Sequence, residues 1–261
     1  MKKMNLNGNN HNSGNLPNAN NPSQHELLCR LARYLNEHLP EGTLVFKGGL
    51  FLGEYTGVPR YTQDVDVSIA SGSIYASIRQ VLTTFGEQLV SEGVIVSYEV
   101  CDEVVEGRSG GAKYRDSTNR VLLSVDISLI GHIRSVVVRD TEVAGTVRLS
   151  SVEQMLADKL TVLYSRKRFR RSKDLFDAWQ IISTCQIDLE ELGKCLAARN
   201  LLPLPVDKAP FNEAHYGELK HAYDRLVIRN ETTQELMVKP DYDEIVSVVG
   251  KFTIPFMEAE V

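Results

Sequence analysis

The chain has 261 residues, 43% of them hydrophobic, and a formal net charge of −5 at pH 7. This length and hydrophobic content suffice to bury a core, as one large domain or two small ones. The negative charge argues against a surface that is positive throughout, so any nucleic-acid partner needs a local basic patch. Four scattered cysteines without ligand spacing argue against a disulfide framework and a zinc site. No run reaches the roughly 18 apolar residues of a membrane span, so we expect a cytoplasmic protein without a membrane partner.

The chain divides into three parts. Residues 1–22 are dominated by Asn with Gly, Ser and Pro, which predicts a disordered tail. Residues 23–149 predict an α/β domain around a mixed sheet. Its expected helices begin at Ser23 and after Gly48-Gly49 and span 74–89, and its expected strands lie at 43–46, 64–69, 136–139 and within 93–100 and 120–129. Residues 150–261 predict a helical C-terminal domain, with helices at 151–168, 172–185, 189–200, 215–228 and 242–249. The predicted fold class is therefore α+β.

Two aspartates lie two positions apart in a predicted strand, in Asp64-Val65-Asp66. Side chains at i and i+2 of a strand share one face, so both carboxylates can bind one cation. A solvated strand edge is the alternative explanation for this pattern. A third aspartate, Asp126, stands centrally in another predicted strand, where aspartate is unfavourable without a partner. Carboxylates gathered at one point repel one another unless a divalent cation neutralises them. The pattern therefore favours a Mg²⁺ site, with two metal ions and a nucleoside triphosphate as the natural occupants.

Two glycines, Gly48 and Gly49, follow the first predicted strand and precede a helix. Without side chains they let the backbone approach a polyphosphate, and the amides of the helix start are its donors. Lys159 lies within the apolar stripe of the first C-terminal helix. It must extend outward to solvent, form a salt bridge with an aspartate at the core edge, or bind an anion such as this phosphate chain.

A basic run follows that helix, with Arg166, Lys167, Arg168, Arg170 and Arg171 around Phe169. It predicts a phosphate-backbone patch for RNA, and the alternative is a solvated connection between helices. Asp174 and Asp177 come next, on one side of the following helix. They either contact Lys159, Arg166 or the nucleotide, or they are helix-start charges that complement the dipole.

Five short motifs together resemble the AbiEii family of nucleotidyltransferases, and the similarity extends over residues 43–182. They are residues 46–49 (Phe-Lys-Gly-Gly), 63–66 (Gln-Asp-Val-Asp), 125–127 (Val-Asp-Ile), 156–160 (Leu-Ala-Asp-Lys-Leu) and 173–177 (Lys-Asp-Leu-Phe-Asp). The family includes toxins of toxin–antitoxin and phage-abortive systems. The resemblance implies a DNA polymerase β-like nucleotidyltransferase fold with a helical C-terminal portion.

The resemblance also implies roles for individual residues. The metal ligands would be Asp64, Asp66 and Asp126, and the catalytic set would add Lys159 and Asp174. Asp126 would either bind the catalytic metal or take the proton from the acceptor hydroxyl as a general base. The nucleotide would be bound by Lys47, Gly48, Gly49, Lys159, Arg166 and Asp177. The chain departs from the family pattern in two places: Gly49 replaces a common serine, and Lys173 replaces the arginine before Asp174, which removes a planar bidentate fork.

The sequence thus predicts a Mg²⁺-dependent enzyme that moves a nucleoside monophosphate from an NTP to an acceptor. The resemblance and the basic run favour the 3′ end of tRNA, or another RNA, as the acceptor, and an antitoxin as a protein partner. One alternative is a nucleotide-binding module without turnover that acts through a protein partner. Another is a sugar transferase that uses a nucleotide-sugar, although that function gives no reason for Lys159 or the basic run.

Overall fold

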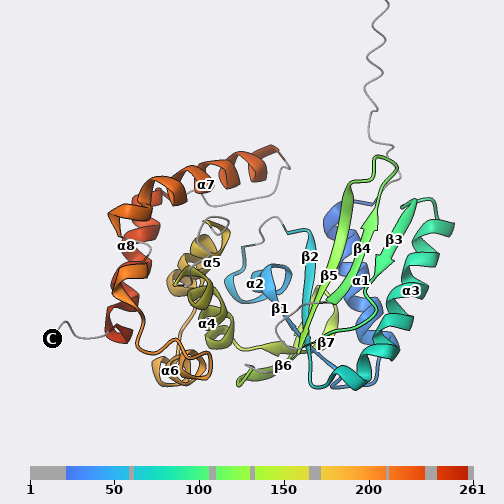
Figure 1. Cartoon of the computed structure of the whole chain (residues 1–261), viewed down its shortest axis with the longest axis horizontal. Coiled ribbons are helices and arrows are strands. Elements are labelled where there is room, and N and C mark those ends of the chain that lie inside the picture. The colour runs from blue at the N-terminus through green and yellow to red at the C-terminus, as the bar shows by residue number, and fades with distance from the viewer. Residues whose placement is uncertain are drawn as a thin grey trace, which may run out of the picture.

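The computed structural model describes residues 22–58, 62–105, 110–129, 133–164, 172–209, 212–232 and 240–257. The tail predicted at residues 1–22 lies outside the described residues except for Pro22. The basic run at residues 166–171 also lies outside them. Figure 1 shows the described elements and their order along the chain.

The centre of the molecule is a mixed sheet of seven strands in the order β3-β4-β5-β2-β1-β7-β6. The parallel pairs are β2 with β5 and β1 with β7, and the other neighbours are antiparallel. The mixed sheet confirms the predicted fold class. The strands are β1 Leu44–Lys47, β2 Asp64–Ile69, β3 Ser97–Val100, β4 Gly110–Arg115, β5 Val121–Leu129, β6 Val136–Thr141 and β7 Gly145–Ser150.

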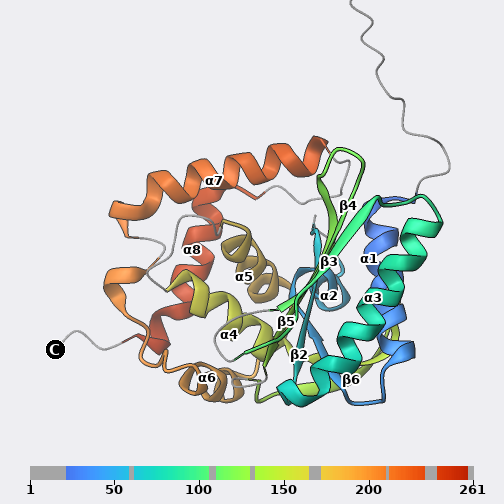
Figure 2. The same ribbon diagram turned by 45° about the vertical axis from the view of Figure 1, so that its right-hand side comes forward.

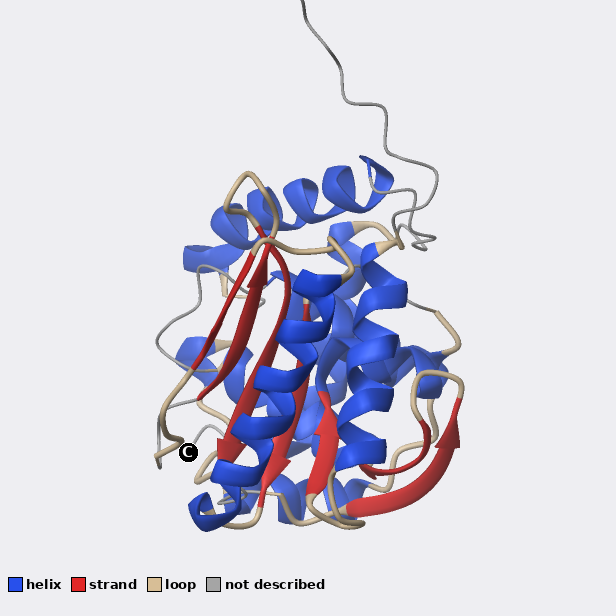
Figure 3. Ribbon diagram, turned by 90° about the vertical axis from the view of Figure 1, so that its right-hand side faces the viewer, coloured by secondary structure: helices blue, strands red, loops and turns tan. Residues whose placement is uncertain are grey.

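Helices cover both faces of this sheet. On one face lie α1 (Gln24–His38) and α3 (Tyr75–Ser91), which stand in front of the strands in Figure 3. On the other face lies α2 (Gly48–Thr56), which contacts β1 and β2. The alternation of β2 explains this arrangement, because Val65 and Val67 are fully buried while Asp64 and Asp66 are only partly buried on the opposite side. The polar face of β2 is therefore the face toward α2.

The C-terminal half is helical, as predicted. It contains α4 (Val152–Leu163), α5 (Ser172–Thr184), α6 (Leu189–Ala198), α7 (Glu213–Thr232) and α8 (Tyr242–Thr253). Helix α5 is its centre and contacts α4, α7 and α8, as Figure 2 shows. Both α4 and α5 also contact α2, so the helical half packs directly on the polar side of the sheet. The boundary placed at residues 149 and 150 stays a prediction.

Two strands were not predicted. Strand β4 begins with two glycines and carries Lys113 and Arg115, a composition with weak strand preference. Strand β7 has buried Val147 and Leu149 at the spacing of a strand, and it pairs along its length with β6 and at Leu149 with β1. Pairing with neighbouring strands, β3 and β5 for β4 and β6 and β1 for β7, therefore maintains both strands.

Helix starts follow the sequence closely. The Ser23 hydroxyl accepts a hydrogen bond from the Glu26 amide and completes a capping box, as expected for α1. At α4 the cap is Ser151, whose hydroxyl accepts from the Gln154 amide. Helix α4 ends at Leu163, earlier than the predicted residue 168, and the chain from residue 165 to 171 lies outside the described residues.

Two further properties bear on the class of protein. Within the described ranges, no helix combines the length and the apolar character needed to cross a membrane. The four cysteines are all free thiols, and Cys29 and Cys195 are buried, in keeping with a packing role.

Gly111 in β4 tests how the sheet supports β5. Its φ is +131°, and a Cβ there would lie 1.9 Å from the carbonyl oxygen of Val125. We expect Gly111→Ala to lower the free energy of unfolding in urea by about 2–4 kcal/mol, because β4 and β5 must separate. The matched control is Gly145→Ala, where φ is +71° and nothing lies within 4 Å. This control should cost about 1 kcal/mol for the backbone conformation alone. Equal losses in the two variants would contradict the steric argument.

Candidate functional site

Three adjacent strands place Lys47, Asp66 and Asp126 in one row. Lys47 of β1 is the register partner of Asp66 in β2, and Asp66 is the register partner of Asp126 in β5. Register partners on neighbouring strands lie about 5 Å apart with their side chains on the same face. Asp64 stands two positions before Asp66 and therefore joins the same face. The predicted metal residues thus meet because of strand pairing.

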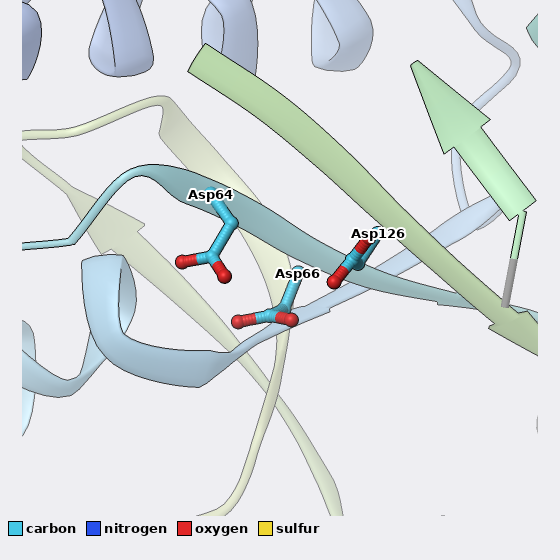
Figure 4. Close-up of side chains that lie close together, drawn as sticks. All are labelled: Asp64, Asp66 and Asp126. Carbon is cyan, nitrogen blue, oxygen red and sulfur yellow. The ribbon is translucent and has the colours of Figure 1, made fainter. Parts of the chain in front are cut away.

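The three carboxylates form one cluster. Asp64, Asp66 and Asp126 each offer an oxygen, and these atoms all lie within 4.8 Å of one another. Figure 4 shows the three side chains on the same side of their strands. Thr62 Oγ1 donates a hydrogen bond of 2.5 Å to Asp64 Oδ1. Hard oxygen donors at this spacing fit a divalent cation.

Electrostatics agree with that fit. Burial, and then the negative charge of Asp64, raise the pKa of Asp66 to about 6, against 3.8 for an ordinary aspartate. The same two causes raise the pKa of Asp126. The positive charges of Lys159 and Lys47 oppose the shift at Asp66 but do not cancel it. The cluster therefore holds more negative charge than its neighbours neutralise, and a bound cation would remove the repulsion.

Gly48 makes room for Asp66. Its φ is +77°, and a Cβ at this position would lie 1.9 Å from Asp66 Oδ2. The glycine expected to approach a polyphosphate therefore also lets the carboxylate approach the start of α2. Gly49 follows as a buried residue in the first turn of that helix.

A pair of serines lies beside the ammonium group of Lys47. Its Nζ donates a hydrogen bond of 2.8 Å to Ser128 Oγ, and Ser128 Oγ lies 2.9 Å from Ser68 Oγ. Burial lowers the pKa of Lys47, although the charges of Asp158 and Asp66 favour its protonated form. This serine pair was not singled out in the sequence, although Ser68 and Ser128 lie two positions after Asp66 and Asp126.

Lys159 binds both aspartates of α5. Its Nζ lies 3.1 Å from Asp174 Oδ1 and 2.7 Å from Asp177 Oδ2. Asp177 is fully buried, and the lysine side chain is 13% exposed. The salt-bridge alternative for Lys159 is therefore what the structure contains. Its positive charge acts on the Asp66 carboxyl of the carboxylate cluster.

A cavity of about 260 Å³, here called the α4 cavity, joins the sheet to the helical half. Its lining combines predicted residues with Asp158 and Arg199, which the sequence reasoning missed. The lining residues are Lys47, Gly48, Asp66, Met155, Asp158, Lys159, Thr161, Val162, Asp174 and Arg199. Asp158 immediately precedes Lys159, a signal that was available, whereas Arg199 lies in a distant turn with no motif around it.

A smaller hollow of about 140 Å³ lies on the other side of the cluster. Asp126 lines it together with Gly111 and Lys113 of β4. The positive charges of Lys113 and Lys173 both act on the Asp126 carboxyl. Arg166 and the rest of the predicted RNA-binding run, Lys167, Arg168, Arg170 and Arg171, lie outside the described residues.

The raised pKa of Asp66 predicts a pH dependence of stability without metal. Because this pKa is about 6 in the folded chain and near 3.8 when unfolded, the folded state holds the extra proton between these values. The stability from Asp66 is therefore present below about pH 4 and lost as pH rises through 6. We expect Asp66→Asn to abolish this loss in the free energy of unfolding, which is on the order of 2 kcal/mol. Urea unfolding of both proteins in EDTA from pH 4 to 7.5 measures the difference, and a difference that does not change with pH would contradict it.

A known protein family and solved structures are similar to this chain. The family model described as "Nucleotidyl transferase AbiEii toxin, Type IV TA system" matches residues 30–248. JHP933 from Helicobacter pylori has a similar fold, with a TM-score of 0.52 at 15% identity over 89% of this chain and 90% of that one. An antigenic nucleotidyltransferase-like protein from Paracoccidioides brasiliensis gives a TM-score of 0.40 at 16% identity over 87% and 92% of the two chains. A search of curated proteins found no match.

The family match spans most of the chain and contains the carboxylate cluster, the α4 cavity and all five motifs that carry the resemblance. The chain therefore belongs to the AbiEii toxin family of nucleotidyltransferases.

Proposed function

We propose that this protein transfers a nucleoside monophosphate from an NTP to the 3′ end of an RNA, with tRNA as the acceptor. The observation that carries the proposal is the carboxylate row at the edge of the α4 cavity, with Asp66 facing the cavity and Asp126 facing the smaller hollow. Two substrates could then meet at the cluster from two sides. The AbiEii family membership supports the same reaction class.

One set of residues would bind the metal and another the phosphates. Asp64, Asp66 and Asp126 would hold Mg²⁺, with two ions as the expected number, because their oxygens are hard ligands at suitable spacing. Bound Mg²⁺ would supply charge neutralisation on the transferred phosphoryl group and the departing pyrophosphate. Lys47 and Lys159 present ammonium groups to the phosphates in the α4 cavity. Gly48 lines the same cavity, so the amides at the start of α2 would be the donors nearest to the phosphates.

Asp174 and Asp177 position Lys159. Two carboxylates on one ammonium group restrain its position. A phosphate that enters the α4 cavity would compete with Asp174, the partner at 3.1 Å that also lines the cavity, for the Lys159 ammonium group.

The chemical step exchanges a phosphoanhydride bond for a phosphodiester bond. The acceptor hydroxyl oxygen forms a bond to the α-phosphorus, the bond to the β-phosphate oxygen breaks, and pyrophosphate departs with the bonding electron pair. The hydroxyl proton goes to the Asp126 carboxylate or, if Asp126 is engaged as a ligand, to solvent. The raised pKa of Asp126 supports the role of base, since a carboxylate with higher proton affinity accepts the proton more readily.

Positive charge on the acceptor side supports RNA. Lys113 and Lys173 act on Asp126 from β4 and α5, and the predicted basic run lies directly before Lys173 in the sequence. An acceptor with a phosphate backbone would be attracted to this side. Modification of tRNA in the cytoplasm would stop translation, which fits a toxin, and a cognate antitoxin is the expected protein partner.

The first test is transfer of label. Purified protein is incubated with Mg²⁺, each α-labelled NTP in turn and total bacterial tRNA. We expect one NTP to label RNA, and Asp64→Ala/Asp66→Ala to reduce the label at least about a hundredfold, because metal ligation supplies several kcal/mol. Asp140→Ala is the matched control, since Asp140 is an exposed strand aspartate on β6. Binding of an NTP without transfer to any RNA would favour the non-catalytic module instead.

The second test concerns the acceptor side. Lys113→Ala and Lys173→Ala should each raise the KM for tRNA about fivefold and lower the salt dependence of RNA binding by about one unit of log–log slope. The KM for the NTP should stay unchanged, because neither lysine lines the α4 cavity. Lys251→Ala on α8 serves as the control for loss of one exposed lysine. A rise in the KM for NTP without a rise for tRNA would contradict an acceptor role.

A further inference from the structure

Arg199 belongs to the α4 cavity although no motif surrounds it. It is the C-cap residue directly after α6, and it lines the cavity together with Gly48, Asp66 and Lys159. Its side chain is only 17% exposed, which is low for an arginine at a helix end. A long cationic side chain is seldom buried at a helix end unless it has an anion to bind.

Asp158 holds this arginine in place. Arg199 Nη2 donates to Asp158 Oδ1, and Gln154 Nε2 donates to the same oxygen at 2.8 Å. Gln154 is fully buried, and its Oε1 accepts a hydrogen bond of 2.9 Å from the Arg134 amide. The guanidinium is therefore oriented by a chain of contacts from α4 to the segment before β6.

Asp158 does not satisfy every donor of the guanidinium. Its Nε is buried and has no hydrogen-bond partner within the described part of the chain. A buried donor without an acceptor is unfavourable. Its charge also acts on Lys47, where it adds to burial in lowering the pKa, so Arg199 and the strand row lie within electrostatic reach of each other. Lys47, Lys159 and Arg199 thus bring three cations from three separate elements to one cavity.

The position of Asp126 indicates which phosphates these cations meet. Asp126 lines the smaller hollow and not the α4 cavity, whereas Asp66 lines the α4 cavity. In phosphoryl transfer the attacking and leaving oxygens are roughly in line, on opposite sides of the reacting phosphorus. If the acceptor approaches from the Asp126 side, the β- and γ-phosphates extend into the α4 cavity, toward Lys159 and Arg199.

We propose that Arg199, positioned by Asp158, binds the β- and γ-phosphates of the incoming NTP and stabilises the departing pyrophosphate. The inference rests on the proposed nucleotidyl transfer and adds a residue to it. Arginine suits this task because its guanidinium has several donors, so that Nη2 can stay on Asp158 while another nitrogen donates to a phosphate. Asp158 would be a positioning residue, because it contacts Arg199 and does not itself bind a phosphate.

Binding without turnover tests the proposal. The affinities of the full chain for inorganic tripolyphosphate, for the NTP and for the matching NMP are measured by calorimetry with Mg²⁺. We expect Arg199→Ala to weaken tripolyphosphate and NTP at least about tenfold and to leave NMP within about twofold, because charged hydrogen bonds to the outer phosphates are lost. Arg199→Lys should give an intermediate loss, since charge remains and the fork does not. Arg148→Ala, which removes a surface arginine bonded to the Gly42 carbonyl, should change none of the three.

The alternative is that Arg199 only stabilises the packing of α6 against α4. Asp158→Asn distinguishes the two, because it breaks the ion pair but keeps the guanidinium. If Arg199→Ala and Asp158→Asn lower the melting temperature alike and tripolyphosphate affinity is unchanged, the proposal is wrong. If Arg199→Ala does not fold, the tripolyphosphate affinity of Arg199→Lys decides, provided that its melting temperature is unchanged. If the wild type labels no RNA but Arg199→Ala loses tripolyphosphate affinity, Arg199 remains a phosphate ligand and the transfer reaction is rejected. A wild type that binds no tripolyphosphate overturns the Arg199 proposal.

Discussion

The repulsion between neighbouring carboxylates is the constraint around which this structure is arranged. Asp66 and Asp126 are register partners on adjacent parallel strands, and Asp64 joins them on the same face. Strand pairing holds the backbone atoms in place, so the side chains cannot separate without breaking the sheet. The folded chain therefore stores negative charge at one point, which favours a divalent cation there and raises the proton affinity of Asp66.

The helical half supplies positive charge to the same place. Lys159 reaches it from α4 and Arg199 from the end of α6, while Lys47 comes from the sheet itself. Each of the two helical cations is paired with carboxylates of its own half: Lys159 with Asp174 and Asp177, and Arg199 with Asp158. These pairs fix the cations where they line the α4 cavity. The contact of α4 and α5 with α2 is thus part of the site as well as of the core.

Much of the fold and the acidic cluster was predictable from local patterns. Asp64 and Asp66 alternate with buried Val65 and Val67, so the face they share follows from the period of a strand. The helices of the C-terminal half follow from apolar spacing and from caps such as Ser151. Strand β4 was not predictable in this way, because its two glycines and its charged residues weaken every local signal and its pairing with β5 maintains it.

The sequence by itself determined which residues are candidates for the chemistry: three aspartates in strands, a glycine pair before a helix, and a lysine in an apolar stripe. Each is a local departure from what its element prefers, and such departures can be recognised without a structure. Only the tertiary structure decided how these residues meet. The register of β2 with β5, the place of Gly48 beside Asp66, and the arrival of Arg199 at the α4 cavity all depend on contacts between distant segments. No local pattern encodes such contacts, because they result from the packing of the whole chain.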